Sequence, residues 1–432
     1  MNNTISIKTL GCKLNQYESS MIASSFVKRG WQVRPFGEKV DIVIVNTCSV
    51  TDKSEKKCRN YIRQGARFSR IGKSIITGCM SEVDRDFLMG MDEVGAVFGN
   101  REKENIHELV MDYVKGIESA GEPITVNMDE VPFSDLVHLS SRTREFVKIQ
   151  DGCDGDCSYC IVPRVRGNPV SRDISEIIEH AGILIGRGCP EIVLTGITIG
   201  KYINEGNDLS TLVKKLSALD GDFRIRITSI EPNHVTDKLI DLFEHDRVCN
   251  HIHLPLQSGS DRILKLMKRP YGEKDYRSII ERIKSKHPFI AIGTDIIIGF
   301  PGEDEADFSR SMEMIEWAGF SYVHQFSFSP RRGTEAAGIE NTLMKNDILN
   351  RSKRMKDIAT DTGIKYARMF EGKVLESVIE KNRKHGTLTS ISDNYLKIKI
   401  DNSLQGRNCA GKMKMVKLLR VDKTGNYGIL QD

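Results

Sequence analysis

The chain has 432 residues, 39% of them hydrophobic and 28% charged, and at about 150 residues per domain this length gives roughly three globular domains. The composition excludes a disordered or collagen-like chain. There are 63 Lys and Arg against 59 Asp and Glu, so the formal net charge is only +4. No run approaches the roughly 18 apolar residues of a membrane span, and the N-terminus lacks the pattern of a secretion signal. We therefore expect a cytoplasmic protein.

The first hundred residues alternate strand patterns with helix patterns, which predicts a parallel sheet covered by helices. Strands are predicted at residues 4–9, 41–46 and 74–77, and helices at residues 16–29 and 53–68. One cysteine follows each strand: Cys12, Cys48 and Cys79. Because the carboxyl ends of parallel strands lie at one edge of a sheet, where ligands bind, we expect these three cysteines to converge.

The segment from Gly116 to about Thr143 has no clear periodicity and is predicted to be a linker. A second alternating series follows, with strands predicted at residues 144–150, 191–195, 223–229, 251–256, 291–298 and 322–328 and helical patterns between them. Six such units suit a partial barrel or an open α/β layer better than a full barrel of eight, which needs about 250 residues. The active face is again expected at the carboxyl ends of the strands.

The last part of the chain changes to a β pattern with a basic charge. After a helix predicted at residues 341–367, strands are predicted at residues 374–380, 395–400 and 412–419. Residues 368–432 contain 13 Lys and Arg against 7 Asp and Glu, a net charge of +6. A small basic β-barrel of this kind often binds nucleic acid. The candidate phosphate contacts are four lysines: Lys397, Lys399, Lys412 and Lys414.

Three cysteines lie within eight residues in a Cys-x3-Cys-x2-Cys run formed by Cys153, Cys157 and Cys160, just after the first strand of the second series. Zinc is one alternative, but a structural zinc site takes four ligands and this loop holds no fourth Cys or His. Packing cysteines are another. A 4Fe–4S cluster fits better, because thiolates are its usual ligands and three of them leave one iron open to bind a substrate.

Ten cysteines in a chain of this length are too sparse for a disulfide scaffold. Without a secretion signal, the compartment is expected to be reducing. The four outside the two sets are isolated in the sequence, and isolated cysteines usually behave as small hydrophobic residues. No function is assigned to these four: Cys58, Cys189, Cys249 and Cys409.

The Cys-x3-Cys-x2-Cys run with Tyr159 before its last cysteine resembles the signature of the radical S-adenosylmethionine superfamily. Further motifs narrow the resemblance to the methylthiotransferases: Thr9-Leu-Gly-Cys-Lys-Leu-Asn-Gln-Tyr-Glu-Ser19, Asn46-Thr-Cys-Ser-Val-Thr51, Thr77-Gly-Cys79, Ile161-Val-Pro-Arg-Val-Arg-Gly167, His253-Leu-Pro-Leu-Gln-Ser-Gly259 and Ile298-Gly-Phe-Pro-Gly-Glu303. The C-terminal part, with Asp393-Asn-Tyr-Leu396, is similar to the TRAM domain that ends those enzymes. These motifs cover nearly the whole chain.

The resemblance implies an α/β fold with three parts. These are an N-terminal doubly wound parallel α/β domain (residues 1–120), a central partial (βα)6 radical-SAM barrel (residues 139–367) and a C-terminal TRAM β-barrel (residues 368–432). It also implies that Cys153, Cys157 and Cys160 hold the 4Fe–4S cluster that binds and cleaves S-adenosylmethionine. A second 4Fe–4S cluster on Cys12, Cys48 and Cys79 would then carry or donate the sulfur.

Residues at the expected strand ends are candidates for cofactor contacts, although each also suits a capping or loop role. They are Tyr159, Thr195, Gly196, Ser229, Glu231, Gln257 and Gly299. Arg164 and Arg166 follow the cluster loop, where they are expected either to reach a phosphate or the cofactor carboxylate or to be solvated. His251 and His253 alternate on one strand and so share a face.

The family has branches that modify isopentenyladenosine in tRNA, threonylcarbamoyladenosine in tRNA, or an aspartate of a ribosomal protein. The sequences of the motifs around Cys12 and Cys48 most resemble those of the threonylcarbamoyladenosine branch. We therefore expect a methylthiotransferase acting on the 2-carbon of that adenosine beside the anticodon, with an electron donor such as flavodoxin or ferredoxin. The alternatives are the other two branches, and a non-catalytic iron–sulfur RNA-binding protein.

Overall fold

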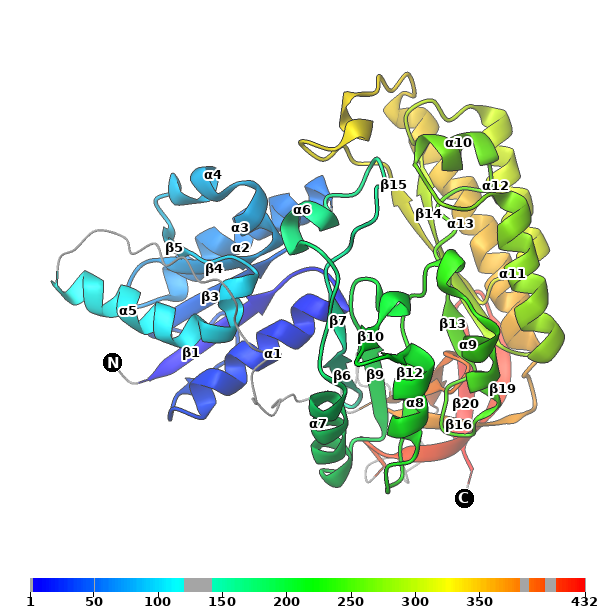
Figure 1. The fold of residues 1–432 in the computed structure, drawn as a ribbon, viewed down its shortest axis with the longest axis horizontal. Helices are drawn as coiled ribbons and strands as arrows, with labels where there is room; N and C mark the ends of the chain where they lie inside the picture. The colour runs from blue at the N-terminus through cyan, green and yellow to red at the C-terminus, as the bar shows by residue number, and fades with distance from the viewer. Residues whose placement is uncertain (1–2, 50, 120–141, 381–387, 401–408, 432) are drawn as a thin grey trace. The chain divides into compact units, whose positions relative to one another are not determined.

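The N-terminal part of the protein is a five-stranded parallel sheet in the order β2-β1-β3-β4-β5 (Figure 1). The computed structural model describes residues 3–49, 51–119, 142–380, 388–400 and 409–431. Buried aliphatic residues of β3 and β4 form the centre of the sheet, which is covered by helices as the sequence predicts. The strands are β1 Thr4–Thr9, β2 Gln32–Val33, β3 Ile42–Thr47, β4 Ser74–Gly78 and β5 Val94–Val97.

The helices of this part are α1 Lys13–Val27, α2 Asp52–Phe68, α3 Cys79–Val83, α4 Arg85–Met89, the short 3-10 helix Arg101–Asn105 and α5 Ile106–Ser119. The linker predicted from Gly116 therefore begins too early, because Gly116 lies inside α5. Ile106, Val110 and Val114 recur at helical spacing and are buried in the core of this sheet, which extends the helix past the glycine. Most of the predicted linker lies outside the described residues.

Contacts divide the chain into two units. The first unit comprises Met1–Ser140 with Gly152–Asp154 and Ile161–Asn168, so it includes helix α6 (Val162–Arg166). The second unit comprises Ser141–Asp151, Gly155–Cys160 and Pro169–Asp432, and it contains both the six-stranded layer and the terminal barrel.

Six parallel strands form the main layer of the second unit. One sheet has the order β6-β9-β12 and the other the order β13-β14-β15, and the bridge between Ser229 and His253 joins them in chain order. This arrangement confirms the six βα units predicted from the sequence. The strands are β6 Glu145–Lys148, β9 Glu191–Thr195, β12 Arg224–Ile227, β13 His251–His253, β14 Ala291–Ile298 and β15 Tyr322–Ser327. The predicted strand from His251 to Leu256 is thus shorter in the structure, ending at His253.

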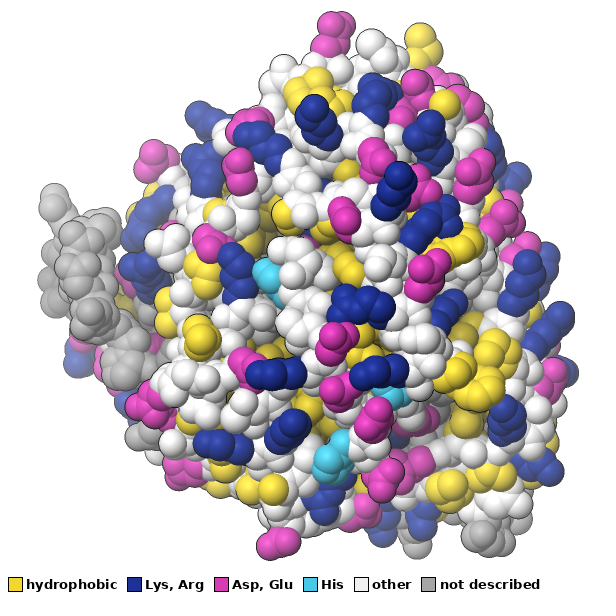
Figure 2. All heavy atoms as spheres, turned by 45° about the vertical axis from the view of Figure 1, so that its right-hand side comes forward, with side chains coloured by type: hydrophobic (Ala, Val, Ile, Leu, Met, Phe, Trp, Pro, Cys, Tyr) yellow, Lys and Arg dark blue, Asp and Glu magenta, His cyan; other side chains and the backbone are white. Residues whose placement is uncertain are grey.

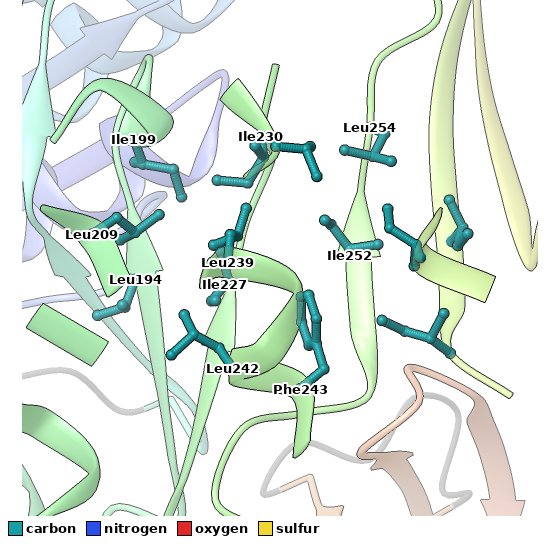
Figure 3. Packing of buried hydrophobic residues seen from close by; sticks show 14 of the residues in the cluster. Leu194, Ile199, Leu209, Ile227, Ile230, Leu239, Leu242, Phe243, Ile252 and Leu254 are labelled. Atoms are coloured by element: carbon teal, nitrogen blue, oxygen red, sulfur yellow. The ribbon is translucent and has the colours of Figure 1, made fainter. Parts of the chain in front are cut away.

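Helices cover one face of this layer and bury its largest hydrophobic cluster. They are α7 Ile174–Gly186, α8 Leu209–Ser217, α9 Asp237–Asp241, α10 Asp261–Leu266, α11 Glu273–Lys286, α12 Glu305–Ala318 and α13 Lys345–Arg368. Figure 3 shows Leu194, Ile227 and Ile252 of three neighbouring strands among the side chains of these helices and the segments that follow them. Two separate two-stranded antiparallel sheets are formed by β7 Gln150–Asp151 with β8 Val170–Ser171 and by β10 Ile203–Asn204 with β11 Asn207–Asp208.

The terminal strands close into a barrel in the order β16-β17-β18-β20-β19, consistent with a TRAM-like domain. The predicted alternation holds in β18, where Ile398 and Ile400 are buried and Lys397 is exposed. The strands are β16 Val374–Ile379, β17 Leu388–Ser392, β18 Lys397–Ile400, β19 Met413–Asp422 and β20 Gly425–Leu430. Strands β17 and β20 are additional to those predicted.

Buried arginines attach this barrel to the amino ends of strands β9 and β12. Glu191, which is fully buried, pairs with Arg224 and Arg226. Arg224 also donates to the backbone oxygen of Ile391, and Arg226 donates to those of Ser392 and Asp393 in the barrel. Burial alone would raise the pKa of Glu191, but the two guanidinium groups hold it well below its ordinary value. The barrel is therefore docked at the end of the layer opposite to the strands' carboxyl edge.

No helix within the described ranges is long and apolar enough to cross a membrane.

Candidate functional site

The three cysteines of the first unit follow strands that are neighbours in the sheet. Cys12 comes after β1 and immediately before α1, Cys48 follows β3, and Cys79 follows β4 and begins α3. Because β1, β3 and β4 are adjacent and parallel, these positions lie at one edge of the sheet. Cys12 is exposed, whereas Cys48 and Cys79 are buried.

Two glycines allow the cysteine loops to approach one another. Gly11 has a φ of 101°, and a Cβ there would lie 2.9 Å from the Cβ and 3.0 Å from the Sγ of Cys48. Gly78 has a φ of 102°, and a Cβ there would lie 2.4 Å from the backbone oxygen of Thr47. Left-handed backbone and this close approach both require glycine. Close packing therefore explains why a glycine precedes Cys12 and Cys79, which the spacing of the cysteines did not explain.

Asn15 connects two of the cysteine loops. Its Nδ2 donates to the backbone oxygens of Leu10 and Thr47, each at 2.8 Å, and its Oδ1 accepts a hydrogen bond from Nη2 of Arg166 at 2.7 Å. Asn15 is 1% exposed, and its bond to Thr47 is buried on both sides. It was not singled out in the sequence, although it lies in the motif that contains Cys12.

Arg166 is buried in the first unit, with 2% of its side chain exposed. The solvated arginine that the sequence offered as one alternative is therefore wrong for Arg166. Its Nη1 donates to Oε1 of Glu18 at 2.7 Å, and the same carboxylate pairs with Lys103. Two cations thus share one buried carboxylate. Desolvation of the Cys12 thiol raises its pKa, although the residue as a whole is exposed, and the Arg166 charge acts in the opposite direction.

Cys58 packs behind the loop of Cys48. The backbone N–H of Cys48 donates to the Sγ of Cys58 at 3.4 Å, and the Cys58 thiol donates to the backbone oxygen of Cys48 at 3.5 Å. Burial raises the pKa of Cys58 to about 11. Because its sulfur bonds to both backbone groups of Cys48, Cys58 packs against this loop and orients it. On another side of the same sheet edge, Cys79 packs against Ile161 and Val165.

The loop with Cys153, Cys157 and Cys160 follows strand β7. The N–H of Cys153 donates to the oxygen of Gly167 at 2.9 Å, and the N–H of Cys160 donates to the oxygen of Cys157 at 3.0 Å. Ser158 fastens the middle of the loop, since its N–H donates to Met267 at 3.1 Å and its hydroxyl donates to the Leu266 oxygen at 2.7 Å. All three cysteines are partly exposed.

Arg269 is a site residue that the sequence reasoning missed. Its Nη1 lies 3.1 Å from the Sγ of Cys157, its Nη2 pairs with Glu231, and its Nε donates to the hydroxyl of Tyr271 at 3.0 Å. Only 4% of the Arg269 side chain is exposed. An arginine more than a hundred residues from the cysteine loop carries no sequence signal that it will contact that loop.

The candidate cofactor residues lie at the carboxyl ends of the strands, in two kinds of environment. Ser229 is exposed and its Oγ lies 2.8 Å from Nδ1 of His253, while Glu231 and Gln257 are partly exposed. These three side chains are accessible to a ligand. Tyr159 is partly buried, with its ring edge-to-face against Phe300 at 6.4 Å.

Thr195, Gly196 and Gly299 have structural partners. Thr195 is buried and its oxygen accepts a hydrogen bond from Ile149 at 2.9 Å. A Cβ on Gly196 would lie 2.6 Å from the oxygen of Gln150, so glycine is required by close packing there. The N–H of Gly299 donates to a Glu303 carboxylate oxygen at 2.8 Å, and its own oxygen accepts from Asn341 at 2.9 Å. Backbone groups of Gly299 therefore already have protein partners.

His251 and His253 share a face of β13, as the alternation predicts. Both rings lie against Tyr322, with centroids 5.8 and 5.9 Å away. Nε2 of His251 lies 2.8 Å from the Tyr322 hydroxyl, and Nε2 of His253 lies 3.2 Å from a carboxylate oxygen of Asp295. Each histidine is part of a packed polar cluster inside the layer.

The four predicted RNA-binding lysines lie in different places on the terminal barrel. Lys397 is exposed and lines a groove of about 680 Å³ between β15, α13 and the barrel, together with Lys356 and Lys423. The Nζ of Lys399 is partly used, because it donates to the Thr424 oxygen at 2.8 Å. Lys412 and Lys414 are exposed near the start of β19, paired with β16.

The donor sets suit iron–sulfur clusters chemically, although neither is gathered into a finished metal site. Over the part of the chain that the structure describes, no three His, Cys, Asp or Glu side chains are arranged as a metal-binding group. Both sets consist of three thiols in loops at strand ends. Thiolate-only ligation is typical of iron–sulfur clusters.

Two family models match the chain. Residues 147–315 match the radical SAM superfamily, and residues 4–99 match an uncharacterized protein family, UPF0004. Among solved structures, the radical S-adenosylmethionine methyltransferase TsrM from Kitasatospora setae has a TM-score of 0.55 over 76% of this chain and 72% of that chain, with 12% identity. This likeness supports the fold of the six-stranded layer.

Similar curated proteins match over almost the full length. The threonylcarbamoyladenosine tRNA methylthiotransferase MtaB of Bacillus subtilis is 34% identical over 98% of this chain and 96% of its own length. MtaB of Thermotoga maritima is 35% identical over 91% of this chain and 90% of its own length. The tRNA-2-methylthio-N(6)-dimethylallyladenosine synthase of Thermotoga petrophila is 33% identical over 88% of this chain and 87% of its length. The protein therefore belongs to the radical S-adenosylmethionine methylthiotransferase family, whose chemistry implies a 4Fe–4S cluster and S-adenosylmethionine.

Proposed function

We propose that this protein is a tRNA-modifying enzyme that methylthiolates the 2-carbon of N6-threonylcarbamoyladenosine beside the anticodon. The observation that carries the proposal is the pair of three-cysteine sets, one after the neighbouring parallel strands β1, β3 and β4 and the other in the loop after strand β7. A protein that only carries electrons usually closes its clusters with four protein ligands. With three protein ligands each, the first cluster would be able to bind S-adenosylmethionine and the second would be able to bind sulfur.

In this proposal Cys153, Cys157 and Cys160 hold the cluster that supplies one-electron reduction of S-adenosylmethionine. The exposed or partly exposed Ser229, Glu231 and Gln257 at the strand ends are the side chains available to bind that cofactor. Hydroxyl, carboxylate and amide groups suit its ribose and amino group. The walls of this proposed cofactor site would be formed by Tyr159 and by the backbone around Thr195, Gly196 and Gly299.

Cys12, Cys48 and Cys79 would hold the second 4Fe–4S cluster. Arg166, Asn15 and the two glycines contribute by fixing the loops that carry these cysteines. The positive charge of Arg166 near Cys12 favours the thiolate that a cluster needs.

The proposal of threonylcarbamoyladenosine as the substrate rests on the similar curated proteins and on the residues of the cysteine motifs. The two MtaB proteins match 91% and 98% of this chain, against 88% for the dimethylallyladenosine synthase, while the identities are similar. The Gly-Cys-Lys-Leu-Asn-Gln-Tyr and Asn-Thr-Cys-Ser-Val-Thr sequences resemble the same branch.

Nucleoside mass spectrometry of tRNA tests the activity and the substrate together. A strain lacking this gene should lose the 2-methylthio derivative of threonylcarbamoyladenosine and regain it with the wild-type gene. Variants with Ala at Cys153 or at Cys48 should fail to restore it, whereas Cys409→Ala, which lies in neither set, should succeed. Loss of the isopentenyladenosine derivative instead would reassign the substrate.

Iron analysis tests the two clusters separately. Replacing Cys153, Cys157 and Cys160 with Ala should halve the iron of the anaerobically reconstituted protein and abolish reductive cleavage of S-adenosylmethionine. Replacing Cys12, Cys48 and Cys79 should also halve the iron but leave that cleavage intact. Full iron in either triple variant contradicts the ligand assignment. Absence of cleavage by the wild type would favour the non-catalytic alternative.

The RNA surface is proposed to be the groove beside the terminal barrel. On the face drawn in Figure 2, Lys and Arg are interspersed with Asp and Glu. In the groove, we expect binding to depend on the particular lysines that line it. Replacing Lys356, Lys397 and Lys423 with Ala should weaken tRNA binding and make its salt dependence shallower. The exposed pair Lys412 and Lys414, at the start of β19, is a second candidate contact. Ala at Lys399, whose ammonium already has a protein partner, should have the smallest effect.

The electron for the reaction is proposed to come from a flavodoxin- or ferredoxin-type carrier. Reconstitution of cofactor cleavage with each purified carrier, in place of dithionite, tests this partner.

A further inference from the structure

Arg269 makes a contact for which the sequence motifs provide no role. Its Nη1 lies 3.1 Å from the sulfur of Cys157, inside the protein, with 4% of its side chain exposed. A guanidinium cannot lose its proton in a protein and is a donor only. The contact is therefore a hydrogen bond from a fixed positive charge to the cysteine sulfur.

The guanidinium is held at this sulfur by contacts on its other sides. Nη2 pairs with Glu231 after β12, and Nε donates to the hydroxyl of Tyr271 at 3.0 Å. That hydroxyl in turn donates to the oxygen of Pro255 at 2.7 Å, beyond the end of β13. The side chain is thus braced from two neighbouring strand ends and cannot leave Cys157 without breaking these bonds.

The turn that carries Arg269 also holds the cysteine loop through its backbone. Ser158, next to Cys157, bonds to the oxygens of Met267 and Leu266. Lys268 has a φ of 55°, a left-handed conformation that non-glycine residues adopt rarely. The N–H of Arg269 donates to Leu264 at 2.9 Å. The turn is therefore built to place one arginine against one cysteine of the loop.

A cation and hydrogen-bond donor at a cluster ligand acts on the electron affinity of the cluster. Hydrogen bonds to the sulfurs and nearby charge are among the features that set the reduction potential of a 4Fe–4S centre. One-electron reduction takes the cluster from its 2+ to its 1+ state and adds negative charge that Arg269 stabilises, more strongly in a buried site than in water. Glu231 neutralises only part of this effect, because it is 30% exposed while Arg269 is 4% exposed.

We propose that Arg269 is a positioning residue that raises the reduction potential of the cluster held by Cys157. The inference rests on the proposed cluster. The step is a one-electron transfer from an external donor to the cluster, with no bond or proton changed at Arg269. An alternative use of the same guanidinium is to bind the carboxylate of S-adenosylmethionine, and the experiment separates the two.

The test is a redox titration of the reconstituted protein with mediator dyes, followed by electron paramagnetic resonance of the reduced cluster. To observe one cluster, Cys12, Cys48 and Cys79 are replaced with Ala in all samples. Arg269→Gln, which removes the charge, should lower the ratio of reduced to oxidised cluster about tenfold at a fixed potential, a shift of about 59 mV to more negative values. Arg269→Lys should shift less. Tyr271→Phe, which removes a brace and keeps the guanidinium, is the matched control and should stay near the parent value.

Each result has a defined meaning. An unchanged midpoint in Arg269→Gln, with iron bound, overturns the inference. So does an unchanged midpoint combined with a raised KM for S-adenosylmethionine, which would place Arg269 on the cofactor. Loss of iron from both the Gln and the Lys variants, with iron kept by Tyr271→Phe, overturns the tuning role in favour of a structural one. Absence of any cluster in the parent protein would instead contradict the proposed function.

Discussion

Replacing Asn15 with Leu should loosen the cysteine edge of the N-terminal sheet. The Asn15 side chain makes three hydrogen bonds of 2.7–2.8 Å, two from its amide nitrogen to the residues Leu10 and Thr47 before Cys12 and Cys48 and one from Arg166 to its oxygen, besides a longer contact from the Cys12 thiol. Leu has a similar volume and can make none of them. At about 1 kcal/mol for each bond, the loss is about 3 kcal/mol.

Calorimetry of the cluster-free protein measures this loss. At roughly 2–4 °C for each kcal/mol in a domain of about 150–250 residues, the transition of the N-terminal unit should fall by about 6–12 °C. After reconstitution, the variant should also bind less iron than the wild type, because two of the three cysteine loops have lost their common anchor.

Ser20→Ala on the same helix is the matched control. Its hydroxyl donates only to the Gln16 oxygen within α1, so the transition should move by less than about 2 °C. If Asn15→Leu unfolded within 2 °C of the wild type and bound the same iron, the argument that Asn15 fixes both loops would be refuted.

Glu191→Gln should cost about 3–5 kcal/mol in urea-induced unfolding followed by circular dichroism, because it leaves buried arginines without their carboxylate; a loss below about 1 kcal/mol would contradict this. Gly11→Ala should lower both stability and iron content more than Gly30→Ala, since both glycines have positive φ but only Gly11 faces a cysteine within 3.0 Å. Equal effects of the two changes would mean that backbone strain alone is responsible. Cys58, with a pKa raised by burial to about 11, should have about one thousandth of its thiol ionised at pH 8 and gain reactivity as the pH rises towards 11. Mass spectrometry of the alkylated, cluster-free protein should therefore find Cys58 unmodified at pH 8, and rapid labelling there would show that its thiol is not buried.

The sequence was most informative where one local pattern determines an element. The bounds predicted for residues 4–9, 191–195 and 291–298 are those of β1, β9 and β14. These strands are rich in β-branched residues: β9 and β14 contain short apolar runs, and β1 alternates Ile with polar residues. Strands β17 (Leu388–Ser392) and β20 (Gly425–Leu430) were not predicted, because Ser, Thr, Gly and Asn take the place of many of the apolar residues that indicate a strand.

The sequence by itself determined the family, the six-unit layer and the terminal barrel, and it marked the two cysteine sets as the candidate site. Short motifs and alternation are local, so they are readable along the chain. Only the tertiary structure decided that Arg166 is buried against Asn15 and Glu18, and that Arg269 reaches Cys157. Those partners lie more than a hundred residues apart in the chain, and a buried arginine has the same sequence appearance as a solvated one. Burial and long-range hydrogen bonding exist only once the strands have brought their ends together.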